Sequence, residues 1–417
     1  MTPRRPGALS RRQMLAGSGL ATAALVTGAG LSSVAGADTP TDPSAATVSD
    51  TVPFHGDHQG GIATPEQARL AFAAFDVTGS DRDALAGLLA TWTHAAEAMT
   101  AGRSVEGAWG MFAPPADTGE ALGLAPSRLT LTVGFGPTLF DDRFGLADRR
   151  PGALLELPAF AGDDLDPARS GGDLCVQACA DDPQVAFHAI HNLTRLGLGT
   201  VTLRYLQIGF GRTASAGGDS ATPRNLLGFK DGTANLDPTR ASAMDRYVWV
   251  SDPSEPGWMR GGTYLVARRI RIHLEAWDRS TLNDQQTTIG RVKDTGAPLG
   301  SAREHDPLDL TAVDSFGTFL IPDGAHVRIA APATNGGAAI LRRGYSFADG
   351  VDPTSGELDA GLFFVCFQQN PTDQFVAIQR KLSELDALTT YLVHTGSGLF
   401  ACPSGTAPGE PWGHGLF

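Results

Sequence analysis

The strongest constraint on the fold is a pattern that occurs twice along the chain. In each half, a short apolar run ends at a turn that contains proline, and a segment with helical periodicity follows. The apolar runs are Leu174–Pro183 and Phe363–Pro371, and the helical segments cover residues 185–193 and 375–385. An apolar run that ends at a turn is typical of a strand, so each half contains a strand followed by a helix.

Each half also carries an earlier strand and helix. The expected strands are Gln67–Asp76 and Gly262–Leu274, and the expected helices are Asp81–Ala101 and Asp278–Gly290. The order in both halves is then strand, helix and strand, with a further helix after the second strand. We therefore predict an α+β fold made of two sandwiches, each of them a sheet backed by helices.

Composition excludes several other classes of protein. The 417 residues include 51 Gly and 27 Pro, which interrupt helices too often for a helical bundle or coiled coil. The chain is 42% hydrophobic, which is enough to bury a core and argues against disorder. There are 32 basic and 45 acidic residues, a formal charge of −13, so general binding to nucleic acid or anionic membranes is not expected.

The four cysteines are too few for a disulfide scaffold in a chain of this length. Cys175 and Cys179 would lie about 13 Å apart on one strand and could not bond to each other. A bridge between Cys366 and Cys402 is geometrically open but has no support in the sequence.

The N-terminus has the layout of a bacterial export signal. Arg11-Arg12 leads into an apolar stretch rich in Gly and Ala, which ends at Ala35-Gly36-Ala37. The stretch lacks the run of about 20 strongly apolar residues that a transmembrane anchor needs, so the anchor is the weaker reading. The twin-arginine route exports folded proteins, often with a cofactor already inserted. We therefore expect a periplasmic or extracellular protein that carries a cofactor.

The domain boundaries follow from these features. We predict a signal peptide over residues 1–37 and a flexible leader over 38–52. The first half would cover 53–212 and the second 225–417, joined by a linker rich in Ser, Gly, Ala and Thr at 213–224.

Two segments of the second half could carry chemistry. Asp231-Gly232 lies in Asn225–Asn235, where flanking glycines would let the backbone aim one carboxylate into a cavity, although such a dipeptide is more often a simple turn. His326 would begin a strand with alternating apolar residues, as either a satisfied core histidine or an iron ligand.

A third candidate is the pair Arg342-Arg343, which lies between apolar residues. One arginine of such a pair would point inward, and a buried arginine needs an anionic partner.

Together these segments resemble the dye-decolorising peroxidases, and especially the exported branch that includes the bacterial deferrochelatase/peroxidases. The likeness rests on three motifs that follow one another, Gly228–Gly232, Ala325–Arg328 and Leu341–Tyr345, together with the export signal, and it runs from Phe54 to the C-terminal region. Three further segments fit the same family: Gly134–Gly136, Ile289–Arg291 and Gly361–Cys366. The resemblance implies two ferredoxin-like halves, with one haem b per chain in the second half. The chain has no C-x-x-C-H motif, so the haem would be non-covalent.

The resemblance also implies roles for individual residues. His326 would be the iron ligand, with Asp386 as the acidic partner of its imidazole. Asp231 would be the distal acid and base, and Arg342, rather than Arg343, would be the distal arginine. Arg291 would contact a haem propionate. An aspartate with an unperturbed pKa of about 3.9 predicts an acidic optimum for the oxidation of substrates.

Three functions remain open at this point. The first is a peroxidase that reduces hydrogen peroxide and oxidises dyes, phenols or other small organic donors. The second is an exported protein that captures haem or releases its iron, with iron-uptake or metal-trafficking proteins as partners. The third is a haem-free binding module of the same fold. Asp231 and Arg342 favour the peroxidase, because storing haem would need only His326.

Several other residues receive structural interpretations. His188 and His191 have helical spacing but no evident third ligand, and His55 and His58 lie close to the predicted mature N-terminus. Aromatic residues could pass electrons to donors too large to reach a buried haem, although most of them are expected in the core. The aromatic candidates are Trp249, Trp258, Trp277, Tyr345 and Tyr391.

Overall fold

The computed structural model describes residues 50–107, 110–211 and 222–417. The predicted signal peptide, most of the leader and most of the linker lie outside the described residues. Within the described ranges, no helix is long and apolar enough to cross a membrane.

The first half contains four strands and two long helices. In chain order they are β1 (Arg69–Val77), α1 (Arg82–Thr100), β2 (Thr130–Phe135), β3 (Leu174–Ala180), α2 (Pro183–Leu196) and β4 (Val201–Phe210). The strands are antiparallel in the order β2-β3-β1-β4. Short 3₁₀ helices lie between β2 and β3, at Pro137–Phe140, Ala147–Arg149 and Pro167–Arg169.

The second half repeats this order with more insertions. Its strands are β5 (Thr263–Ile272), β6 (Leu341–Arg342), β7 (Tyr345–Val351), β8 (Leu358–Gln368) and β9 (Leu392–Cys402). Its α-helices are α3 (Ala241–Tyr247), α4 (Leu274–Asp278), α5 (Leu282–Ile289), α6 (His326–Ala330) and α7 (Ala377–Leu385). A π-helical turn, Thr372–Val376, leads into α7, and 3₁₀ helices occur at Gly257–Met259, Pro332–Thr334 and Ala387–Tyr391. The main strands are antiparallel in the order β9-β5-β8-β7, and β6 also pairs with β8.

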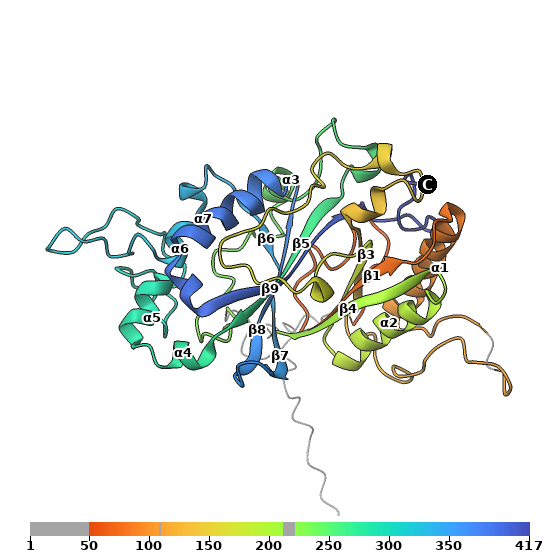
Figure 1. Cartoon of the computed structure of the whole chain (residues 1–417), viewed down its shortest axis with the longest axis horizontal. Coiled ribbons are helices and arrows are strands. Elements are labelled where there is room, and N and C mark those ends of the chain that lie inside the picture. The colour runs from red at the N-terminus through yellow and green to blue at the C-terminus, as the bar shows by residue number, and fades with distance from the viewer. Residues whose placement is uncertain (1–49, 108–109, 212–221) are drawn as a thin grey trace, which may run out of the picture. The chain divides into compact units, whose positions relative to one another are not determined.

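The two sheets join into one ring of strands. β2 meets β9 at Phe135 and Ala401, and β4 meets β7 at Phe210 and Ser346. Because β5 pairs with both β8 and β9, the sheet closes on itself as a barrel does. Figure 1 shows the strands converging at the centre, with α1 and α2 beside β1–β4 and α4–α7 on the other side.

The closed sheet explains why the strand sequences are continuous apolar runs. Leu70, Phe72 and Ala74 of β1 belong to a core cluster shared with β8 and β9. Ala71 and Phe75 point to the opposite face and pack in the cluster that contains α1 and α2. Since successive side chains of a strand alternate between faces, a strand covered on both faces is apolar at every position.

Capping residues begin the two long helices of the first half. The Asp81 side chain accepts hydrogen bonds from the backbone N–H groups at the start of α1, and Asp182 does the same for α2, where Pro183 is the first residue. Such caps satisfy N–H groups that have no partner within the helix. The predicted helix Asp81–Ala101 is thus confirmed.

Two local predictions for the second half need correction. The helix expected at Asp278–Gly290 begins later, as α5 at Leu282, because the Thr281 side chain caps its start, and a separate short helix, α4, precedes it. The strand expected to start near His326 is the short helix α6, which contacts α7. A pattern of alternating polarity over only five residues fits one helical turn as well as it fits a strand.

Candidate active site

His326 is the first residue of α6, and its ring is fixed by the carboxylate of the residue that follows α7. The ring Nδ1 lies 2.6 Å from Oδ2 of Asp386. Asp386 follows α7, and its Oδ1 accepts a hydrogen bond from the Leu388 N–H at 2.9 Å. One oxygen of Asp386 therefore caps a helix while the other orients the imidazole. The structure thus brings His326 and Asp386 into contact, while their roles at a haem stay a prediction.

The charge of Asp386 changes the basicity of His326. Burial disfavours the charged imidazole and by itself lowers its pKa, but the Asp386 carboxylate outweighs this effect and raises the pKa overall. The hydrogen bonds of the described residues engage Nδ1 and leave Nε2 for another partner. The His326 side chain is 34% exposed, so this second nitrogen can be reached.

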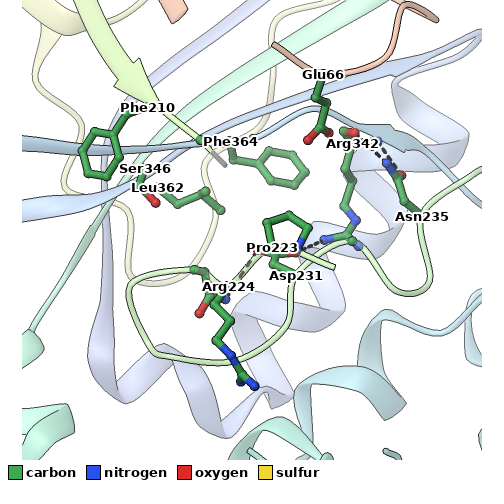
Figure 2. Close-up of a pocket in the computed structure, with 14 residues that line it drawn as sticks. Glu66, Phe210, Pro223, Arg224, Asp231, Asn235, Arg342, Ser346, Leu362 and Phe364 are labelled. Carbon is green, nitrogen blue, oxygen red and sulfur yellow. Dashed lines mark hydrogen bonds and ion pairs between the residues drawn. The ribbon is translucent and has the colours of Figure 1, made fainter. Parts of the chain in front are cut away.

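Asp231 and Arg342 form an ion pair, although they are 111 positions apart in the sequence. Nη1 of Arg342 lies 2.7 Å from Oδ1 of Asp231, and Nδ2 of Asn225 lies 3.4 Å from Oδ2. Arg342 belongs to β6, while Asp231 lies in the loop before α3. Figure 2 shows the guanidinium and the carboxylate meeting at one side of a cavity.

The loop that carries Asp231 is held in a defined conformation. Gly228 and Gly232 have φ values of 83° and 122°, which residues with a Cβ rarely adopt. The Asn235 side chain accepts a hydrogen bond from the Arg342 N–H and donates one to the Arg342 carbonyl. Asn235 therefore fixes the loop against β6, and the ion pair is built on this frame.

The ionised form of Asp231 is favoured by its neighbours. Burial by itself raises the pKa of Asp231, but the Arg342 guanidinium, the Asn225 amide and His326 lower it, so the pKa lies below its ordinary value. Asp231 is a carboxylate at neutral and mildly acidic pH as a result.

A cavity lies beside the ion pair. Its walls include the residues Glu66, Phe210, Asp231, Arg342, Leu362 and Phe364. His326 does not belong to these walls, but Arg342 and Asp231 both act on its pKa, so the imidazole is within electrostatic range of the pair. A histidine with one free nitrogen, a carboxylate and a guanidinium therefore share one region of the second half.

The two neighbouring arginines have different surroundings. Arg343, not Arg342, is the fully buried one, at 2% exposure. Its guanidinium donates to the Thr64 carbonyl and to the side-chain oxygen of Gln67. The half-buried Arg342 has the expected anionic partner, Asp231, whereas the hydrogen bonds of the fully buried Arg343 go to neutral oxygens and its Nε has no partner among the described residues.

Arg291 follows α5 and is also buried. Its Nη1 donates to the carbonyls of Gly296 at 2.7 Å and Glu304 at 3.0 Å. Burial lowers the pKa of Arg291, and the Arg342 charge lowers it further, while Glu304 raises it. The two cations therefore lie in the same region, and contact with a propionate remains a prediction.

The remaining histidines and cysteines have structural partners. His188 is buried and its Nε2 lies 2.8 Å from Asp117 and from the Asn192 amide. His58 stacks on Trp249, with ring centroids 3.6 Å apart. All four cysteines are buried, and no disulfide joins them in the described part of the chain.

The aromatic candidates for electron transfer are covered by protein. Trp249, Trp258, Trp277 and Tyr345 are buried, and Tyr391 is half-buried. Trp277 packs edge-on against Tyr391, with centroids 5.0 Å apart, and Tyr391 is the last residue of the 3₁₀ helix that Asp386 caps. Core packing accounts for these positions.

Sequence reasoning missed three polar residues around the cavity. Asn225 and Asn235 flank the Asp231 loop, and Glu66 reaches the same cavity from the first half. The two asparagines could have been noticed, since they bracket the glycine-rich motif symmetrically. Glu66 follows Pro65 in a polar segment, where nothing in the local pattern sets it apart.

Comparisons with known proteins agree with this geometry. A family model described as Dyp-type peroxidase, N-terminal, matches residues 59–211, and one described as Dyp-type peroxidase, C-terminal, matches residues 222–407. A deferrochelatase of Escherichia coli O6:K15:H31 is 41% identical over 353 residues, covering 84% of this chain and 82% of that protein.

Solved structures match over a similar length. Ferric DtpA from Streptomyces lividans superposes with a TM-score of 0.83 at 43% identity, covering 88% of this chain and 97% of that one. A DyP-type peroxidase from Cellulomonas bogoriensis gives a TM-score of 0.80 at 40% identity, covering 88% of this chain and 98% of its own.

Proposed function

The chain belongs to the Dyp-type peroxidase family, and we propose that His326, Asp386, Asp231 and Arg342 form its catalytic centre around one non-covalent haem b. The enzyme is an oxidoreductase that acts on a peroxide. The observation that carries the assignment of residues is the arrangement of two polar pairs. His326 is tied to Asp386, Asp231 is tied to Arg342, and the two pairs act on each other electrostatically.

The residues present fit a haem. A histidine that binds iron must offer a nitrogen lone pair, and the Nε2 of His326 is accessible while Nδ1 is held by Asp386. When bound, haem supplies a ferric iron that takes oxidising equivalents from peroxide and passes them to an organic donor. The Asp386 carboxylate makes the imidazole a stronger electron donor and fixes the orientation of its ring.

Asp231 would move the protons of peroxide. Its carboxylate accepts a proton from one peroxide oxygen and returns that proton to the other oxygen, which leaves as water. Such positioned acid–base catalysis contributes about 10²–10⁴-fold to a rate. Asp231 is suited to the first transfer because its lowered pKa keeps it ionised.

Arg342 would serve two purposes in this step. Its guanidinium, 2.7 Å from Asp231, keeps the carboxylate charged and in place. The same positive charge stabilises the negative charge that develops as the O–O bond breaks. Arg291 is buried nearby and would supply a further cation for a haem propionate.

A haem titration tests the assignment of His326. We expect the mature chain to bind one haemin per chain with a ferric Soret band, and His326→Ala to lose this band. His305→Ala is the matched control, since the His305 side chain is 70% exposed and pairs with the Glu304 carboxylate. An unchanged Soret band in His326→Ala would overturn the assignment of the iron ligand.

Release of iron from haem is a second candidate function. It is supported by the 41% identity to a protein named deferrochelatase. Removal of iron that leaves the porphyrin intact would produce fluorescent free porphyrin. If porphyrin forms from haem at a rate that Asp231→Asn leaves unchanged, iron release is a separate activity of the chain. If no porphyrin forms, this candidate fails.

We also propose that the protein is exported through its twin-arginine segment and works in the periplasm or outside the cell. The support is the order of Arg11-Arg12, the apolar stretch and Ala35-Gly36-Ala37. Mass spectrometry of the secreted protein should find Asp38 as the first residue. A cytoplasmic protein that keeps its first 37 residues would contradict export.

The two halves are proposed to be copies of one ferredoxin-like unit, of which the second holds the haem. Both halves place their main strands in equivalent order, β4-β1-β3-β2 in the first and β9-β5-β8-β7 in the second. Asp231, His326, Arg342 and Asp386 all belong to residues 225–417. A crystal structure with haem bound elsewhere than at His326 would contradict this placement.

A further inference from the structure

We propose that Glu66 is a relay residue that passes protons between bulk water and Asp231 through the cavity they share. The proposal rests on the proposed function, because it takes Asp231 as the acid and base of the peroxidase. Glu66 would touch neither peroxide nor haem and would act through Asp231. The first half of the chain would thereby contribute to a site built by the second.

Glu66 is held at the cavity by the buried arginine. Arg343 donates to the Thr64 carbonyl and to the Gln67 side chain, one on each side of Glu66 in the sequence. Arg128 donates to the Glu66 carbonyl at 3.2 Å. The backbone at Glu66 is therefore fixed at several points, and its side chain is a wall of the cavity that Asp231 also lines.

The side chain of Glu66 points into the site. Figure 2 shows its carboxyl group directed toward Arg342, on the opposite side of Phe364 from Phe210. Glu66 is exposed, whereas Asp231 is half-buried at 29%. A group that contacts both solvent and cavity can exchange protons with bulk water and with a water molecule between the two carboxylates.

The charges around Glu66 suit a proton donor. Among the described residues, the charges of Arg343, Asp231 and Arg342 act on its carboxyl group. The protein that surrounds the carboxyl group raises its pKa, and Asp231 raises it further, while the two guanidinium groups lower it. The balance is a raised pKa for Glu66, opposite to the lowered pKa of Asp231. At a pH between the two pKa values, Glu66 keeps its proton while Asp231 is ionised, so a proton is held in the same cavity as a free acceptor.

The stoichiometry of the reaction requires protons to enter the site from bulk water. Each turnover combines one peroxide with two donors, H₂O₂ + 2 AH → 2 H₂O + 2 A•. Donors that are too large to enter the site each give up one electron at the surface, and the two donors of one turnover release their two protons there. Two protons must then enter the site separately to complete the second water. In each transfer the O–H bond of Glu66 breaks, an O–H bond forms on Asp231 through the intervening water, and bulk water reprotonates Glu66.

Glu66→Gln in the haem-loaded enzyme tests the relay, because the amide keeps the shape and cannot supply the proton. With a bulky dye as donor, we expect kcat to fall by about tenfold, less than the loss of a direct acid–base group. The kcat/KM for peroxide should fall less than kcat, because the peroxide step recycles its own proton. The solvent deuterium isotope effect on kcat should rise, and Glu66→Asp should recover part of the loss.

Rescue of kcat by small weak acids distinguishes a proton relay from a purely structural role of Glu66. Acetate or formate should restore kcat in Glu66→Gln by carrying protons into the cavity. The matched control is Glu156→Gln, which removes an exposed carboxylate that does not line the cavity. The control should show neither the loss nor the rescue. Equal losses in kcat and kcat/KM, or no rescue, would overturn the relay.

A measurement without turnover checks the coupling between the two carboxyl groups. Infrared difference spectra of the haem-free protein should show a carboxyl group that titrates above the ordinary glutamate pKa of about 4.3. This signal should vanish in Glu66→Gln and move to lower pH in Asp231→Asn, which removes a neighbouring negative charge. A signal that Asp231→Asn leaves in place would refute the relay. Full peroxide activity in Asp231→Asn would instead refute the proposed function.

Discussion

Replacing Arg342 by methionine should move the acidic limit of the peroxidase to higher pH. Asp231 accepts a proton only as a carboxylate, so the rate of the peroxide step falls as the pH drops through the pKa of Asp231. In the native chain Arg342 holds that pKa below its ordinary value, against the effect of burial. Arg342→Met removes the guanidinium and leaves the effect of burial, so the pKa rises and the acidic limit rises with it.

The size of the shift follows from the ion-pair geometry. Nη1 and Oδ1 are 2.7 Å apart, and the two side chains are 32% and 29% exposed. With charge centres ~4 Å apart and an effective dielectric constant of ~20, the attraction is ~4 kcal/mol, an upper limit of ~3 pKa units. Water that replaces the guanidinium will recover part of this energy, so we expect a shift of about 1–2 pKa units.

The assay is the dependence of kcat/KM for peroxide on pH, measured in the haem-loaded enzyme at fixed ionic strength. Arg342→Lys is the control, because it keeps a positive charge near Asp231 and should shift the acidic limit less. The rate of Arg342→Met at its optimum should also fall, since the developing charge loses its partner. An acidic limit that coincides with that of the native enzyme, or that moves to lower pH, would refute the electrostatic role of Arg342.

Three further predictions concern the support of the site and the core. Asp386→Asn should speed the transfer of haem to apomyoglobin by about tenfold or more, since partners that orient a ligating imidazole affect metal affinity by about 10–100-fold; an unchanged transfer rate would contradict this. Trp92→Ala should lower the free energy of unfolding by about 3–5 kcal/mol in a urea titration, because Trp92 is fully buried and donates to the Leu193 carbonyl; a loss below about 1 kcal/mol would argue against its core position. Gly290→Ala should lower the melting temperature, since Gly290 has a φ of 91° and a Cβ would lie 2.5 Å from Val327; an unchanged melting temperature would contradict that geometry.

Much of the fold could be predicted because the strands and long helices have strong local signals. Asp81 and Asp182 are helix caps that can be recognised without tertiary information, and the apolar runs of β1, β3 and β8 reflect burial on both faces. Closure of the sheet could not be predicted, because it depends on two strand pairings of one residue pair each, Phe135 with Ala401 and Phe210 with Ser346. Such contacts join residues far apart in the sequence and leave no periodic pattern.

The site was predictable where a motif carries it. Asp231, His326, Arg342 and Asp386 were assigned from a resemblance, and the structure brings them together as two hydrogen-bonded pairs. The helical conformation of His326 was not predictable, because one turn of alternating polarity fits a strand equally well.

Glu66 could not be assigned from the sequence for a different reason. Its position at the cavity depends on Arg343, which lies 277 positions later and anchors the residues on both sides of Glu66. Arg342 thus binds the Asp231 carboxylate directly, and Arg343 holds the backbone segment that carries Glu66. Only the folded chain reveals this division of roles.

The central claim is that Asp231 moves the protons of peroxide beside a haem held by His326. The most direct test is the visible spectrum of haem-loaded Asp231→Asn, mixed with one equivalent of hydrogen peroxide and compared with the native enzyme. We predict that both proteins show the same ferric Soret band before mixing. We also predict that the spectral change after mixing is at least about 10²-fold slower in Asp231→Asn. A change as fast as that of the native enzyme would contradict the claim.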